Sequence, residues 1–113
     1  EAMTFLLSQH PEVVGVFAIN DPSAMGAAQA ARLGGRDDIV ITSVDGSEEL
    51  VRALAAGHTN LIATAAQAPQ EMAQQAIGLS LERLGNPLQA RQVVRIPTHL
   101  ITQQSLLDAT EVD

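Results

Sequence analysis

Cysteine, lysine, tryptophan and tyrosine are all missing from this chain of 113 residues. Without cysteine there is no disulfide framework, no zinc–thiolate site and no cysteine nucleophile. The six basic residues are therefore all arginines, and 13 acidic residues bring the formal net charge to -7. Because so acidic a chain is poorly suited to neutralising phosphates, we expect it to bind no nucleic acid.

Long hydrophobic runs are absent too. The longest apolar stretches have about seven residues, whereas a membrane-spanning helix needs about 20. No secretion-signal pattern opens the sequence. The length allows one modest domain, and with Phe5 and Phe17 as its only aromatic residues we expect a thin core.

Short apolar runs alternate with helical patterns through the middle of the chain. The runs at 13–19, 39–44 and 61–66 predict strands, the first two being rich in β-branched residues. A residue typical of helix starts follows each run, namely Pro22, Ser47 and Pro69. Strands joined by short connections through helices run parallel, so the sequence predicts an α/β fold with three α/β/α layers around a parallel sheet.

The two ends of the chain carry weaker patterns. Helical spacing before Pro11 predicts a first helix. After the long helix that starts at Pro69, we expect an extended pair around 93–96 and 99–101. The polar residues beyond this pair predict no element.

A polar side chain follows each of the three predicted strands. Asn20, with Asp21 beside it, follows the first strand, Asp45 the second and Gln67 the third. In an open parallel sheet, ligands bind outside the carboxyl ends of the strands. Carboxylates and amides at this edge suit a polyhydroxylated ligand, because they accept and donate hydrogen bonds to hydroxyl groups. Helix caps, turns and solvated side chains are the structural alternatives, and these residues alone leave both open.

No other residues have the spacing of a catalytic or metal site. The three histidines are not spaced as metal ligands, and the sequence has no dinucleotide fingerprint, phosphate loop or nucleophile elbow. The acidic pairs at 37–38 and 48–49 are expected to be solvated. We therefore expect neither enzymatic activity nor a cofactor nor a metal.

Several short motifs occur in a characteristic order. Residues 16–27 read VFAINDPSAMGA, residues 44–46 read VDG, and residues 63–69 read ATAAQAP. They resemble the "VFAxNDxxAxGA", "GFDG" and "ATxAQxP" segments of ribose-type periplasmic sugar-binding proteins of ABC importers. Residues 84–87 and 100–102 resemble the ending of the last helix and the closing strand of that family, which has the type I periplasmic binding protein fold.

The resemblance implies a sugar-binding protein. In that family the sugar lies between two α/β lobes, and an ATP-driven membrane permease receives it. By resemblance, Asn20, Asp45 and Gln67 match positions that hydrogen-bond sugar hydroxyls. The implied ligand is a monosaccharide or related polyol, and the implied location is periplasmic or extracellular, at the membrane through the transporter.

The resemblance covers only the C-terminal portion of such a protein. It implies that residues 1–67 belong to the C-terminal lobe, with the strand ends of the ligand cleft. Residues 68–113 then hold a long helix that crosses the hinge, and terminal strands that belong partly to the other lobe. Because half of the sheet would be missing, we expect exposed strand edges and self-association, with exchange of the helix that starts near Pro69 as one route.

Two other functions are compatible with an α/β chain of this kind. The effector-binding core of a lactose-repressor-type regulator shares the fold, but those regulators usually carry Asp-Asp where this chain has Asp45-Gly46. A small flavodoxin-like signalling or enzyme domain needs a phosphate loop, or an acidic cluster with a lysine. The importer component is therefore the preferred hypothesis, and the sequence does not identify the sugar.

Overall fold

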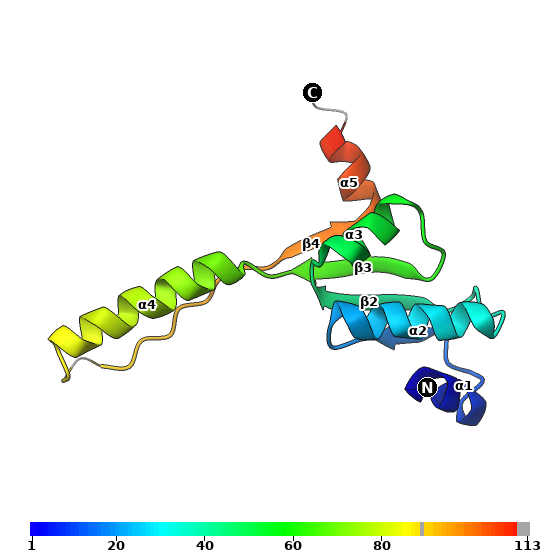
Figure 1. Ribbon diagram of the computed structural model, residues 1–113, viewed down its shortest axis with the longest axis horizontal. Helices are drawn as coiled ribbons and strands as arrows, with labels where there is room; N and C mark the ends of the chain where they lie inside the picture. Colours follow the sequence, from blue (N-terminus) through cyan, green and yellow to red (C-terminus); the bar gives the residue numbers. More distant parts are fainter. Residues whose placement is uncertain (89, 111–113) are drawn as a thin grey trace. The chain divides into compact units, whose positions relative to one another are not determined.

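The computed structural model describes residues 1–88 and 90–110, the last without its side chain (Figure 1). The chain divides into two compact units. Residues 1–66 and the C-terminal stretch from residue 99 form the first unit, and residues 67–98 form the second. No helix in the described ranges is both long and apolar enough to cross a bilayer.

A four-stranded sheet is the centre of the first unit. Its strands lie in the order β1 (Gly15–Phe17), β2 (Val40–Asp45), β3 (Leu61–Ala66) and β4 (His99–Thr102). The first three are parallel, which confirms the α/β class, whereas β4 runs antiparallel to β3. Two strands joined by one crossover helix run parallel. β3 and β4 are joined instead by all of residues 67–98, so this rule does not determine the direction of β4.

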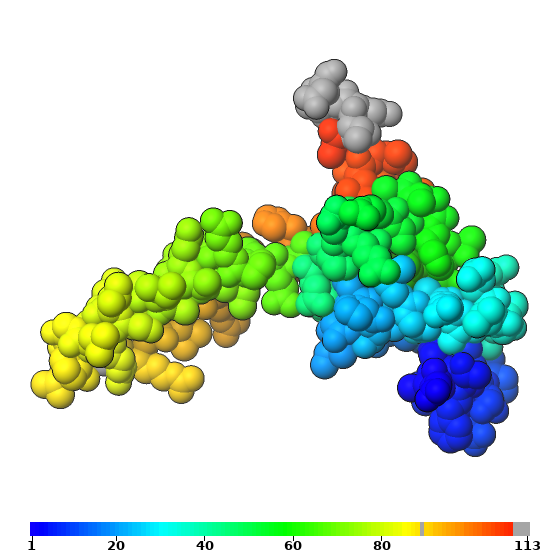
Figure 2. All heavy atoms as spheres, in the orientation of Figure 1, coloured from blue at the N-terminus to red at the C-terminus, as the bar shows by residue number. Residues whose placement is uncertain are grey.

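Two helices connect the parallel strands and cover one side of the sheet. They are α2 (Asp21–Leu33) and α3 (Glu48–Ala55). Right-handed crossovers that move along the sheet in one direction place both helices on the same side, as Figure 1 shows. The helices adjoin one another in the space-filling view (Figure 2). Ser47 caps α3, as predicted, by accepting a hydrogen bond from the Leu50 amide at 3.3 Å.

Two short helices complete the first unit. The predicted first helix is α1 (Ala2–Gln9), which packs on α2 and buries Met3. The C-terminal helix α5 (Gln103–Thr110) was not predicted. Its start is stabilised by Thr102 and Ser105, whose hydroxyls each accept from the other's backbone amide at 3.1 and 3.0 Å. This reciprocal capping pattern was the overlooked signal for a helix start.

The core lies between the helices and the sheet and contains no aromatic ring. Phe5 is 65% exposed and Phe17 is 69% exposed. The alanines of α2 allow this helix to lie close to the strands, and aliphatic side chains of the strands and α3 fill the remaining volume of the core. The fully buried members are Ala24, Ala28, Ala31, Ile39, Ile41, Leu50 and Leu54.

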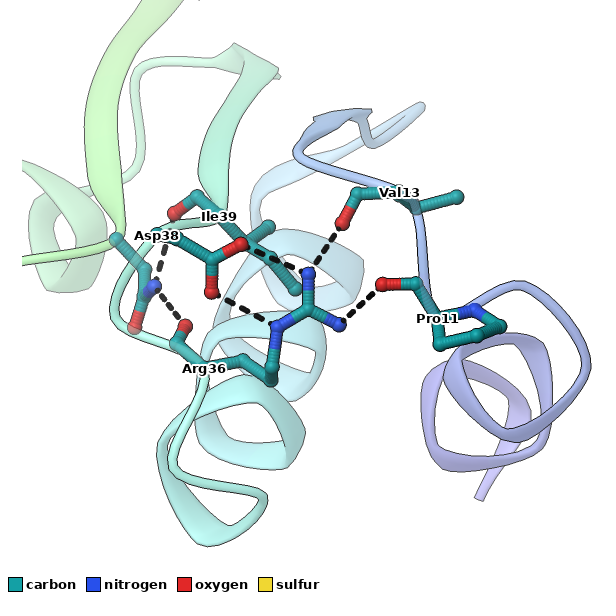
Figure 3. A network of polar contacts seen from close by, with 6 residues as sticks. Pro11, Val13, Arg36, Asp38 and Ile39 are labelled. Carbon is teal, nitrogen blue, oxygen red and sulfur yellow. Dashed lines mark hydrogen bonds and ion pairs between the residues drawn. The ribbon is translucent and has the colours of Figure 1, made fainter.

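One arginine joins the connections at the amino ends of the strands (Figure 3). Arg36 donates to the carbonyl oxygens of Pro11 and Val13 at 2.9 and 2.7 Å, and to both carboxylate oxygens of Asp38 at 2.8 Å. The hydrogen bond between the two side chains raises the pKa of Arg36 and lowers the pKa of Asp38. Asp38 is exposed, as predicted, and it is also the ion-pair partner of Arg36. The Asn60 amide adds hydrogen bonds to two carbonyl oxygens, those of Arg36 and Ile39.

The second unit contains the long helix α4 (Pro69–Gly85), which begins at the predicted proline. Its apolar residues Ile77, Leu81 and Leu84 are exposed. Residues 93–96 form no strand, so the prediction of an extended pair is wrong for that half. A strand is stable only with a hydrogen-bonded neighbour, and residues 67–98 contain no described strand that could pair with it.

Candidate functional site

The carboxyl ends of β1 and β2 bring Asn20 and Asp45 to the same edge of the sheet. Asn20 is the N-cap of α2, and its Oδ1 accepts from the Ser23 amide at 2.9 Å. The next amide along the chain, that of Asp21, points to Oδ2 of Asp45 at 3.4 Å. Asn20 is half-buried and Asp45 is exposed, so both side chains are accessible from solvent.

Asp21 lies below this edge and is fully buried. Its Oδ1 accepts from the hydroxyls of Ser43 at 2.6 Å and Thr64 at 2.8 Å. Its Oδ2 accepts from the backbone amide of Ser47 at 2.6 Å. One carboxylate therefore connects the start of α2 with β2, β3 and the start of α3. We call Asp21, Ser43, Ser47 and Thr64 the buried hub.

The buried hub keeps Asp21 ionised. Burial by itself raises the pKa of this carboxyl, but the hydrogen bonds from Ser43, Ser47 and Thr64 together outweigh it, and the pKa is lowered. A charged carboxylate with three donors is a strong local constraint, because removing it leaves those donors unpaired. Asp21 therefore has a positioning role beneath the exposed pair.

The backbone is strained at the last residue of β2, Asp45, where the strand enters the turn. Asp45 has a φ of 133°, and it is the only described residue other than glycine with a positive φ. Gly46, with a φ of 75°, donates its amide to the Thr64 hydroxyl at 3.2 Å. A Cβ on Gly46 would lie 2.4 Å from the Cβ of Ala66, so the turn lies tightly against the end of β3. Strained residues with exposed polar side chains are typical of ligand sites.

Gln67 directly follows the last residue of β3, Ala66, which pairs in register with Asp45. It is the first residue of the second unit. The structure therefore brings Asn20 and Asp45 together, while the position of the Gln67 side chain beside them stays a prediction. The contact of any of the three with a sugar is also still a prediction.

The sequence reasoning missed two members of the buried hub, Ser43 and Thr64 as partners of Asp21. Both are polar residues within otherwise apolar strand runs, and both face the covered side of the sheet, since they are paired in register and nearly or fully buried. A buried hydroxyl needs a partner, so polar residues at inward positions were the available signal.

Residues 1–86 match the family described as the periplasmic binding protein domain. The chain belongs to this family. The resemblance seen in the motifs is thereby confirmed.

Curated relatives of this periplasmic binding protein chain are sugar import proteins. It is 34% identical over 93 residues to the ribose import binding protein RbsB of Escherichia coli, covering 81% of this chain and 31% of that protein. It is 30% identical over 111 residues to the D-apiose import binding protein of Actinobacillus succinogenes, covering 98% and 32%. The chain thus spans about a third of the length of these relatives.

Solved structures of the family agree with this fold. An ABC transporter solute-binding protein from Mycobacterium smegmatis with bound glycerol is 33% identical, with a TM-score of 0.78, covering 95% of this chain and 36% of that one. One from Agrobacterium vitis with bound allitol is 27% identical, with a TM-score of 0.80, covering 97% and 39%. The periplasmic binding protein fold therefore extends over nearly the whole chain.

Proposed function

We propose that this chain is the C-terminal part of the solute-binding component of an ABC-type carbohydrate importer. It would form one side of a site for a monosaccharide or related polyol. The observation that carries this proposal is the strained, exposed Asp45 beside Asn20 at the carboxyl edge of the sheet, above the buried hub. The names of the relatives, which are ribose and D-apiose import binding proteins, support the same substrate class.

The two side chains offer complementary hydrogen-bonding groups. Oδ1 of Asn20 caps α2, so its amide nitrogen is the group available as a donor. Asp45 offers only acceptors, and its Oδ2 accepts from the Asp21 amide. One sugar hydroxyl can therefore accept from Asn20 and donate to Asp45. We propose Gln67 as a third contact from the start of the second unit.

The proposed role is to bind a ligand, without a chemical reaction. We propose no catalytic step, cofactor or metal. In the whole protein, residues 68–113 would carry the hinge crossing and part of the other lobe, and the closed lobes would dock on the membrane permease in the periplasm or outside the cell. The import proteins among the relatives, together with Asp45-Gly46, do not favour the alternative of a lactose-repressor-type regulator.

Self-association of this chain is part of the proposal. β1 is at one end of the strand order and pairs only with β2 among the described strands. A free strand edge is a template for pairing with a second chain. Exchange of α4, whose apolar side is exposed, is one route for such association.

Asp45→Ala is expected to weaken sugar binding at least about tenfold, because a hydrogen bond to a charged group contributes about 1.5 kcal/mol or more. Calorimetric titration with a panel of pentoses and hexoses measures this change. Asp37→Ala, which removes another exposed carboxylate, is the matched control and should bind as the wild type does. A sugar that binds equally well to the wild type and to Asp45→Ala would remove Asp45 from the site.

A second substitution separates binding from folding. Asp45→Gly removes the same carboxylate but relieves the positive φ, so it should weaken binding while raising the midpoint of thermal unfolding. Loss of stability in Asp45→Gly would instead indicate that the carboxylate is mainly structural.

A further inference from the structure

Thr64 lies in β3 and is fully buried beneath the edge that carries Asp45. Its hydroxyl donates to Oδ1 of Asp21 at 2.8 Å and accepts from the Gly46 amide at 3.2 Å. A hydroxyl has one proton to donate, and the Asp21 carboxylate takes it, so the oxygen meets the Gly46 amide with a lone pair. One buried oxygen atom therefore joins the start of α2 to the turn that follows β2.

The Gly46 amide belongs to the peptide group that directly follows Asp45. A hydrogen bond that fixes this peptide group also restricts the ψ angle of Asp45, whose φ is 133°. A residue keeps such a sparsely populated conformation only where the surrounding contacts hold it. The Thr64 hydroxyl is one of these contacts, and the hydrogen bond from the Ser47 amide to Asp21 at 2.6 Å is another.

Ser43 provides an internal comparison with Thr64. The two residues are paired in register on neighbouring strands, and they are 3% and 0% exposed. Both hydroxyls donate to Oδ1 of Asp21, at 2.6 and 2.8 Å. Of the two, only Thr64 also accepts from the Gly46 amide in the described contacts. The two residues therefore support Asp21 in a similar way and differ in their contact with the turn.

We infer that Thr64 is a positioning residue for the proposed sugar site and holds the Asp45 carboxylate in its binding orientation through the Gly46 amide. Thr64 does not touch the sugar, because its side chain is fully buried. A carboxylate that is held in place before the ligand arrives binds more tightly than a mobile one, since less conformational entropy is lost on binding. This role of Thr64 rests on the proposed function, because it concerns the same site.

Thr64→Val is expected to weaken sugar binding about fivefold, which is less than the loss expected from removing the Asp45 carboxylate itself. Calorimetric titration with the panel of pentoses and hexoses measures the change. Ser43→Ala is the matched control, because it removes a donor to the same oxygen of Asp21 but keeps the bond to Gly46. It should weaken binding by at most about twofold. Thr64→Ser keeps the hydroxyl and should restore most of the affinity.

A double-mutant cycle with Asp45→Gly distinguishes positioning from a general loss of stability. Asp45→Gly has neither the carboxylate nor the strained conformation that Thr64 holds. In this background Thr64→Val should therefore weaken binding by less than about twofold, compared with about fivefold in the wild type. The same factor in both backgrounds would show that Thr64 acts on the site by another route, and would overturn the inference. Thr64→Ala removes the same hydroxyl and takes the place of Thr64→Val if circular dichroism shows that Thr64→Val is unfolded.

Hydrogen exchange tests the contact between Thr64 and the turn without any sugar. The Gly46 amide should exchange faster in Thr64→Val than in the wild type, and at the wild-type rate in Ser43→Ala. Equal exchange of this amide in Thr64→Val and in the wild type would overturn the inference. A wild type that binds no sugar of the panel would contradict the proposed function and the role of Thr64 together. Binding by the wild type that Thr64→Val leaves unchanged would overturn the role of Thr64 alone.

Discussion

Gly46→Ala is expected to lower the free energy of unfolding by about 3 kcal/mol or more. Two costs add at this position. The φ of 75° is in the left-handed region that disfavours any Cβ, and the new Cβ would lie 2.4 Å from the Cβ and 2.8 Å from the Cα of Ala66. Since Ala66 is the end of a paired strand, it cannot move without disturbing β3.

Urea denaturation of matched variants separates the two costs. Gly35 has a φ of 66° with no atom within 4 Å of a Cβ, so Gly35→Ala carries the conformational cost alone, about 1 kcal/mol. The double variant with Ala66→Gly removes one of the two close contacts and should recover part of the loss. Equal destabilisation by Gly46→Ala and Gly35→Ala would show that the contact with β3 is unimportant.

Asp21→Ala is expected to cost about 3 kcal/mol of unfolding free energy at neutral pH, the typical effect of removing one partner from a buried charged network. The hydroxyls of Ser43 and Thr64 and the backbone amide of Ser47 all lose their acceptor, and the amide, unlike a hydroxyl, cannot rotate about a side-chain bond. We therefore expect the first turn of α3 to open more often. Hydrogen exchange measures this as faster exchange at the first turn of α3, and unchanged exchange there would contradict the role of the buried hub.

The stabilisation by Asp21 should also depend on pH. Its pKa in the folded state is lowered below 3.8, the ordinary value, so the ionised carboxylate stabilises the fold above pH 3.8. This contribution is lost as the pH falls through the lower folded-state pKa. Asp21→Asn does not titrate, so the difference in unfolding free energy between wild type and Asp21→Asn should be constant near neutral pH and shrink in acid.

Most elements near the site could be predicted from local chemistry. β-Branched runs mark β1 and β2, and proline or serine marks the starts of α2, α3 and α4, because strand and cap preferences depend on neighbours close in the chain. The rule for parallel strands was sufficient to place Asn20 and Asp45 at one edge. The order of the short motifs was sufficient to identify the family.

The different roles of Asn20 and Asp21 could not be predicted in this way. Both follow the same strand and both suit a helix cap. Asp21 is buried because Ser43 and Thr64 reach it from strands 22 and 43 residues further along the chain. The strain at Asp45 likewise depends on how closely the turn approaches β3.

Fold class, strand ends and family thus follow from patterns within about ten residues, since hydrophobic periodicity and caps act over that range. Other features depend on which segments far apart in the sequence contact one another. They are the direction of β4, the burial of Asp21 and the exposure of Phe17. The same apolar pattern in β1 is compatible with a strand covered on one side or on both. Tertiary packing decides between them, because only the presence of a partner surface makes an apolar side chain part of a core.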